Sequence, residues 1–232
     1  MSVEALIPEK KQYSIVALGN FNPEMFQPQW FCRQGIISQE DADFAVDQNS
    51  SSPLIVTPQI TLFRTPQMTV QIATKRFEVK AEKEPLITLI DFISKTFENL
   101  GAYSIPAFGF NYIANYEMKS VEEYHRIGDK LAPKGFWEDL LEDEITGNDR
   151  KSGLVSLQMK KKKKNSDDYI LFTLQGSPFV TNAFMLSCND HNTMSDENQS
   201  AEYVIELINK RYEEAFDNMS NLQVKLMERV RA

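Results

Sequence analysis

The sequence predicts an α+β fold built from two similar halves, in which antiparallel sheets carry helices on one face. Three observations support this fold. A strongly alternating stretch, Ile105–Met118, lies near the middle of the 232-residue chain. The same order of expected elements, β-α-β-β-(β)-α, occurs before and after it, although the residues of the two halves do not align. The second half then closes with a long helix whose apolar residues recur at three- and four-residue spacing.

The central stretch Ile105–Met118 is expected to be a half-buried strand. Successive side chains of a strand point to opposite faces, and aromatic residues at every second position suit a face that packs on another layer. One face would carry Phe108, Phe110, Tyr112, Ala114, Tyr116 and Met118. The other would carry Gly109, Asn111, Asn115 and Glu117. We interpret the stretch as a core strand.

The first half, residues 1–100, begins with a buried strand at Ser14–Phe21 and continues with two short helices. Asn22 with Pro23 suits the start of one helix and Ser38 the start of the other, because Asn and Ser cap helices and Pro fits a first turn. A hairpin and a helix should follow. These elements are expected at Leu54–Phe63, Met68–Lys80 and Leu86–Leu100, with a bulge where the alternation is interrupted at Ala73–Arg76.

The second half, residues 101–232, repeats this order after the central strand. Ser120 and Glu123 form a capping-box pattern at the start of a helix near Val121–Leu131. Three strands are expected next, at Leu154–Lys161, Tyr169–Gln175 and Ala183–Cys188. The pattern allows either two separate sheets or one continuous sheet.

The long terminal helix has the most regular pattern in the chain. Its apolar residues follow an a/d seam over about three heptads. The seam contains Ile205, Ile208, Tyr212, Ala215, Met219, Leu222 and Leu226. A helix of about thirty residues is ~45 Å long, which is more than a sheet of short strands would cover. We therefore expect its end to pack on an N-terminal segment or to project and pair with a partner.

Charge and composition restrict the class of protein. The net charge is −8 with a pI near 5.0, which argues against a chain that binds polyanions over its whole surface but allows a local basic patch. No apolar run is long enough to span a bilayer, and the N-terminal residues contain no apolar signal segment. With only Cys32 and Cys188, we expect a cytoplasmic protein without disulfides.

Five consecutive lysines, Lys160–Lys164, end one expected strand. Clustered ammonium groups bind phosphates with release of counterions, so this run is a candidate contact for a polyanion. No arginine or aromatic residue is interleaved with the lysines, as strand-binding surfaces usually have. The competing interpretation, which we favour on the sequence, is a solvated hairpin tip whose charge prevents edge-to-edge association.

Residues suited to catalysis or metal binding are few. Cys188 and His191 have a Cys-x-x-His spacing, but a structural zinc site needs two such pairs and Cys32 stands alone. Spacing does not decide whether Cys188 is a nucleophile with His125 or His191 as its base. We interpret Cys188 as a strand-end residue and Asp190 as a turn residue. We expect no metal and no cofactor, and we favour a protein that is not an enzyme.

Three stretches carry a resemblance to a known family: LGNFNPEMFQPQWFCRQGIIS, IPAFGFNYIANY and EYVIELINKRYEEAFDNM. In them the chain resembles a sporadically distributed family of bacterial proteins of unknown function. That resemblance implies a place in mobile or defence loci and brings no catalytic residue. The order of elements is also similar to the twofold layout of TATA-binding-protein-like, helix-grip folds, whose members bind nucleic acid, small ligands or proteins.

Three functions remain open, and none of them involves a membrane. We favour a non-enzymatic interaction or adaptor subunit that assembles with itself or with another protein. The resemblance implies that it belongs to a defence-type complex. Its contacts would be Ile205, Ile208, Tyr212, Met219, Leu222 and Leu226. The first alternative is a nucleic-acid-binding subunit that uses Lys160, Lys161, Lys162, Lys163 and Lys164. The second is a small-ligand or enzymatic pocket lined by Phe108, Phe110 and Tyr112, or by the opposite face of that strand.

Overall fold

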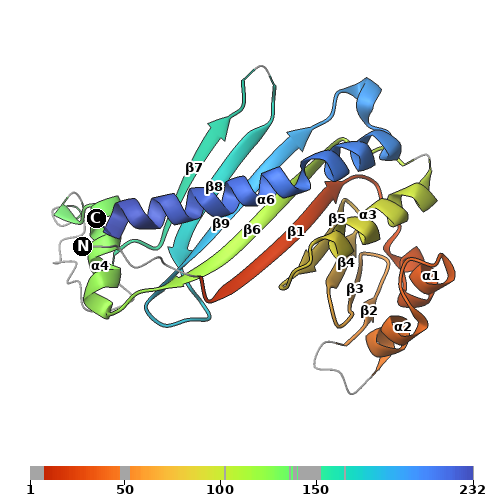
Figure 1. Ribbon diagram of the computed structural model, residues 1–232, viewed down its shortest axis with the longest axis horizontal. Helices are drawn as coiled ribbons and strands as arrows, with labels where there is room; N and C mark the ends of the chain where they lie inside the picture. The colour runs from red at the N-terminus through yellow and green to blue at the C-terminus, as the bar shows by residue number, and fades with distance from the viewer. Residues whose placement is uncertain are drawn as a thin grey trace.

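The computed structural model describes residues 8–47, 53–101, 103–135, 137, 140, 153–164 and 166–231, and its centre is one antiparallel sheet of nine strands (Figure 1). The strands lie in the order β2-β3-β4-β5-β1-β6-β9-β8-β7. Their bounds are β1 Lys10–Leu18, β2 Ile55–Val56, β3 Ile60–Arg64, β4 Thr69–Ala73, β5 Arg76–Ala81, β6 Ala107–Glu117, β7 Ser156–Lys162, β8 Tyr169–Gly176 and β9 Ala183–Thr193. The fold is α+β, as the sequence predicts.

The sheet joins the two halves of the chain at its centre. β1, the first strand of one half, pairs with β6, the first strand of the other. Outward from this pair, β5, β4 and β3 on one side occupy the places that β9, β8 and β7 occupy on the other. Each half then ends in a helix, α3 (Ile87–Leu100) or α6 (Ala201–Arg231). The repeated layout therefore forms a continuous sheet around a local twofold arrangement.

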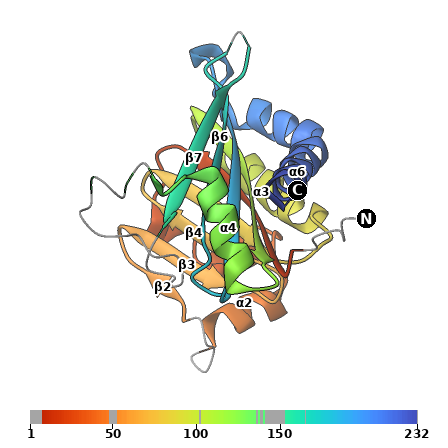
Figure 2. The ribbon, with the colours of Figure 1, turned by 90° about the vertical axis from the view of Figure 1, so that its left-hand side faces the viewer.

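The helices cover one face of this sheet. α3 and α6 contact each other, and Figure 2 shows both on the same side of the strands. Phe216 of α6 packs on Tyr13 of β1 and Phe110 of β6, with ring centroids 5.3 and 5.5 Å away. The remaining described helices are the short η1 (Pro23–Met25), α1 (Pro28–Arg33), α2 (Gln39–Val46), α4 (Val121–Leu131) and η2 (Asp196–Asn198). α4 packs at the end of the second half, where Tyr124 stacks on Phe184.

The structure corrects three strand predictions. The interrupted alternation at Ala73–Arg76 is not a bulge but the turn between β4 and β5, which pair with each other. Leu54–Phe63 contains two strands, β2 and β3, with Pro58 in the segment between them. β9 continues past Cys188, because Asp190 is a buried strand residue with paired charge and not a turn residue.

The long helix α6 lies along the sheet. β6 and β9 contain 11 residues each, which is about 36 Å of strand beneath a helix of ~45 Å. The end of α6 is held by α4, since Arg231 pairs with Glu123 at 2.9 Å and Lys130 donates a hydrogen bond to the carbonyl of Arg229 at 3.1 Å. The strands therefore do not cover the whole helix, and in the described part of the chain its end packs on α4 and not on the N-terminal segment that one of the two expectations names.

Candidate nucleic-acid interface

The surface of the sheet opposite α3 and α6, which we call the open face, carries every second residue of each strand. The ladder register fixes these residues, because directly paired residues of neighbouring strands share a face. Tyr13 packs on α6, so its neighbour Ser14 lies on the open face. The same cross-strand row contains Asn111 of β6 and Asn189 of β9.

The open face is basic, although the whole chain has a net charge of −8. Of the strand residues that the structure describes, six basic and two acidic ones lie on it. They are Lys10, Arg64, Arg76, Lys80, Lys160 and Lys162, and Glu78 and Glu117. Glu78 is buried and neutralises part of this charge, since its carboxylate lies 3.1 Å from Arg76 and 3.4 Å from Lys80. The excess of basic groups gives this face an attraction for polyanions that the net charge of the chain does not reveal.

The lysine run is divided between the two faces of the sheet, because successive residues of a strand point to opposite faces. Lys160 and Lys162 of β7 lie on the open face, whereas Lys161 points to the helix side. Lys162 also pairs with Asp167 in the hairpin turn at 2.9 Å, and both side chains are exposed, so this pair is weak. The hairpin therefore contributes two lysines to the open face.

Lys163 has a structural role. Its ammonium group contacts the carboxylate of Asp190, and the same carboxylate lies 3.6 Å from Arg211 of α6. Asp190 is only 7% exposed, and its two cationic partners offset the cost of burying its charge. Lys164 follows at the exposed part of the hairpin. These contacts attach the end of the hairpin to the helix side of the sheet.

An aromatic stack lies beside the open-face lysines. Tyr169 of β8 and His191 of β9 are paired in the sheet, and their ring centroids are 4.5 Å apart. The ammonium group of Lys160 lies 3.8 Å from the centre of the Tyr169 ring, in a cation–π contact. Burial lowers the pKa of His191 below its usual value, so its ring is mainly neutral at pH 7. Aromatic residues are thus interleaved with the lysines in space, although not in the sequence.

Two asparagines occupy the middle of the open face. Asn111 and Asn189 are directly opposite each other, and Nδ2 of Asn189 donates a hydrogen bond to Oδ1 of Asn111 at 2.7 Å. The other two amide atoms, Nδ2 of Asn111 and Oδ1 of Asn189, are buried without a hydrogen-bond partner in the described part of the chain. The centre of the face therefore holds one unused donor and one unused acceptor.

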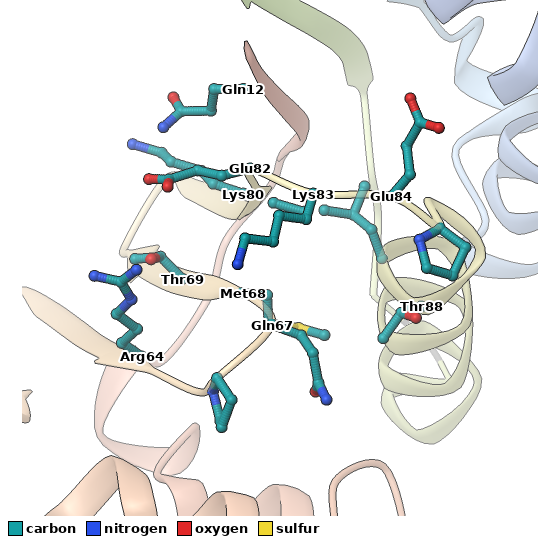
Figure 3. Close-up of a pocket in the computed structure, with 14 residues that line it drawn as sticks. Gln12, Arg64, Gln67, Met68, Thr69, Lys80, Glu82, Lys83, Glu84 and Thr88 are labelled. Atoms are coloured by element: carbon teal, nitrogen blue, oxygen red, sulfur yellow. The ribbon is translucent and has the colours of Figure 1, made fainter. Parts of the chain in front are cut away.

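A groove lies at the end of the open face where β1 begins and β5 ends. Its two parts have volumes of about 280 and 600 Å³ and share Gln12, Glu82 and Lys83, and we call them together the end groove. Figure 3 shows the smaller part, where Lys83 extends toward Thr69 and Glu84 points away from the other labelled residues. Glu84 accepts a hydrogen bond from the Tyr13 hydroxyl at 3.0 Å. Burial is the main cause that raises the pKa of Tyr13 above its usual value, and this hydrogen bond is the second.

Most of the predicted interaction residues of α6 lie inside the protein. Ile208 and Met219 are fully buried, and Ile205, Tyr212 and Leu226 are partly buried against the core. Leu222 is 43% exposed. Towards the end of the helix, the residues that point into the core are Gln223 and Met227. The predicted seam contains Leu222 and Leu226 instead. Assembly through this helix stays a prediction, and it would have to use the exposed side around Leu222.

The aromatic side of the central strand is filled. Phe108, Phe110 and Tyr112 are at most 1% exposed and belong to the core beneath α6. A ligand pocket on that side would require the core to open. The opposite side of the strand belongs to the open face, and there Ile113 and Asn115 line the end groove.

Cys188 and His191 point to opposite faces of the sheet, which separates the two residues of the Cys-x-x-His pattern. Cys188 pairs with Tyr112 on the helix side, whereas His191 pairs with Gly109 on the open face. His125 is buried in α4, and its Nε2 has no partner in the described residues. Burial, with a smaller contribution from Asp190, raises the pKa of Cys188 to about 12. A thiol of this kind is a poor nucleophile.

Thiol titration should separate the two cysteines. We expect one thiol, that of half-buried Cys32, to react with Ellman's reagent in the native protein, and the buried Cys188 to react only after unfolding. The variant Cys32→Ala should therefore lose the native reaction. Loss of that reaction in Cys188→Ala instead would show that the thiol of β9 is accessible and reactive.

The described residues were compared with the requirements of a metal site and of a membrane-spanning helix. No three of their His, Cys, Asp and Glu side chains are grouped to hold a metal ion. None of their helices is both long and apolar enough to cross a bilayer. Comparison of the chain with protein-family models and with curated proteins found no match. The geometry and charge of the open face are therefore the features that indicate a function.

Proposed function

We propose that the protein binds nucleic acid on the open face of its sheet. The observation that carries the proposal is the separation of charge: among the described strand residues, six basic and two acidic side chains lie on this face, although the net charge of the chain is −8. Basic groups that neutralise phosphates release condensed counterions, and this release supplies most of the affinity of such surfaces.

The distribution of these groups favours a polymer over a small anion. Lys160 and Lys162 lie near one edge of the sheet and Arg64 near the other. Nine strands at their usual spacing make a face about 38 Å wide. Between its edges lie uncharged polar residues that are not buried, among them Gln71 and Thr173, which suit contacts to sugars and base edges. A phosphate backbone that crosses the face would meet basic groups at both ends.

Neutralising the open-face lysines of the hairpin should weaken binding. We expect Lys160→Gln with Lys162→Gln to reduce the affinity for a short DNA by about one to two orders of magnitude at low salt, and to reduce the slope of log affinity against log salt by about 2. Fluorescence anisotropy over a series of salt concentrations measures both quantities. Neither lysine is buried, so the fold should be unaffected.

The matched control removes the same charge from the opposite side of the molecule. Lys210→Gln with Lys225→Gln changes two exposed lysines of α6 and should leave affinity and salt slope close to those of the wild type. Equal losses in both double variants would mean that total charge and not the open face governs binding. Absence of binding by the wild-type protein to DNA and to RNA would refute the proposal.

A further inference from the structure

Phe179 is an exposed aromatic residue in a loop that hydrogen bonds hold in place. It lies between β8 and β9 and is 73% exposed. The hydroxyl oxygen of Ser177 accepts hydrogen bonds from the backbone N–H groups of Phe179 at 3.2 Å and Val180 at 3.1 Å. The same hydroxyl donates to Oδ1 of Asn115 at 2.7 Å, which attaches the loop to β6. Because the loop is fixed, little conformational entropy remains to be lost when a ligand packs on this ring.

The surroundings of Phe179 combine apolar surface with positive charge. It lines the larger part of the end groove together with Ile113 and Met185. The basic residues of this part are Lys10, Lys11 and Lys83, and the acidic ones are Glu9 and Glu82. A ligand that matches it needs a flat apolar group next to an anionic one. A nucleotide within a strand has both, since its base is flat and its phosphate is charged.

The smaller part of the end groove continues this arrangement. Lys83 belongs to both parts, and Arg64 and Lys80 line the smaller one (Figure 3). Glu84 also lines it, but its carboxylate is turned to Tyr13 and is hydrogen bonded there. A backbone that passes Phe179 therefore finds further cations along the same groove.

We infer that the end groove binds a single-stranded segment of nucleic acid, with one base stacked on Phe179 and neighbouring phosphates beside Lys10 and Lys83. This inference rests on the proposed function and assigns the kind of nucleic acid. In a duplex the bases stack on one another, and their faces are not free for a side chain. In a single strand each base can stack on an aromatic ring whatever its identity. Recognition in this groove is accordingly tolerant of sequence.

The test compares a labelled oligothymidylate of about 12 nucleotides with a duplex of the same length. Phe179→Ala should weaken binding of the single strand by about 5- to 150-fold, which is the usual effect of losing one stacked base, and should leave duplex binding unchanged. Phe179→Trp should retain the affinity, and the added indole fluorescence should be quenched on binding. The control Phe44→Ala removes an exposed aromatic side chain from α2, away from the groove, and should change neither affinity.

The outcomes separate this inference from the proposed function. If Phe179→Ala leaves single-strand affinity unchanged while Lys160→Gln with Lys162→Gln reduces it, stacking on Phe179 is refuted and the basic face remains. Equal weakening of single strand and duplex by Phe179→Ala refutes the assignment to single strands. If the wild-type protein binds neither nucleic acid, the proposed function fails and this inference fails with it.

Discussion

Replacing Met219 by aspartate should leave most of the protein unfolded at room temperature. Met219 is 2% exposed and belongs to the core cluster between α6 and the sheet. Removing a buried methionine side chain costs about 2–5 kcal/mol of unfolding free energy. A buried carboxylate without a partner adds a further penalty. The sum is comparable with the total stability of a typical domain, about 5–15 kcal/mol. Circular dichroism during urea unfolding measures the loss.

Leu222→Asp is the matched control for this change, because it places the same residue three positions further along the same helix. Leu222 is 43% exposed, so an aspartate there remains hydrated, and we expect a loss of less than about 1 kcal/mol. Light scattering in line with size exclusion adds a second readout. A Met219→Asp variant that stays folded and falls from dimer to monomer would show that the helix seam is an interface between copies and not a part of the core.

The sequence predicts those features of the fold that depend on local periodicity. Alternation assigns the two faces of β6 correctly and distributes the lysines of β7 over both sides of the sheet. Local alternation also failed at Ala73–Arg76, where a tight turn between two strands interrupts the pattern in the way a bulge would. The order of elements identified the repeated layout, because both halves use the same sequence of strands and helices.

Features that depend on partners distant in sequence could not be predicted. The sequence predicts a turn at Asp190, but the residue lies buried in a strand because Lys163 and Arg211 approach it from other elements. The basic character of the open face could not be predicted from the sequence for the same reason. Its charged residues are distributed over five strands, and only the sheet register brings them to one surface. The net charge of −8 therefore concealed the surface on which the proposed function depends.

Gln223 shows most clearly why the buried side of α6 differs from the predicted seam. Apolar spacing selects Leu222 and Leu226, but the fully buried residue is Gln223. Its Nε2 donates hydrogen bonds to the backbone carbonyls of Tyr112 at 3.2 Å and Leu186 at 3.1 Å, one on each central strand of the second half. Its Oε1 accepts a hydrogen bond from the hydroxyl of Tyr116 at 3.4 Å. One side chain thus forms hydrogen bonds with three polar groups of the core, although hydrophobicity alone would place it outside.

Gln223→Ala should therefore lower the unfolding free energy by about 2–4 kcal/mol, because it leaves a cavity and removes three buried hydrogen bonds. Leu222→Ala, the adjacent truncation at a partly exposed site, should cost less than about 1 kcal/mol. Tyr116→Phe removes only the hydroxyl, and in combination with Gln223→Ala it should cost less than the two single changes added together, because they share one hydrogen bond. Equal losses for Gln223→Ala and Leu222→Ala in urea unfolding would mean that the amide does not set the rotation of α6. A strictly additive double variant would remove the hydrogen bond to Tyr116 from the explanation and leave the two backbone carbonyls as the groups that hold Gln223 in the core.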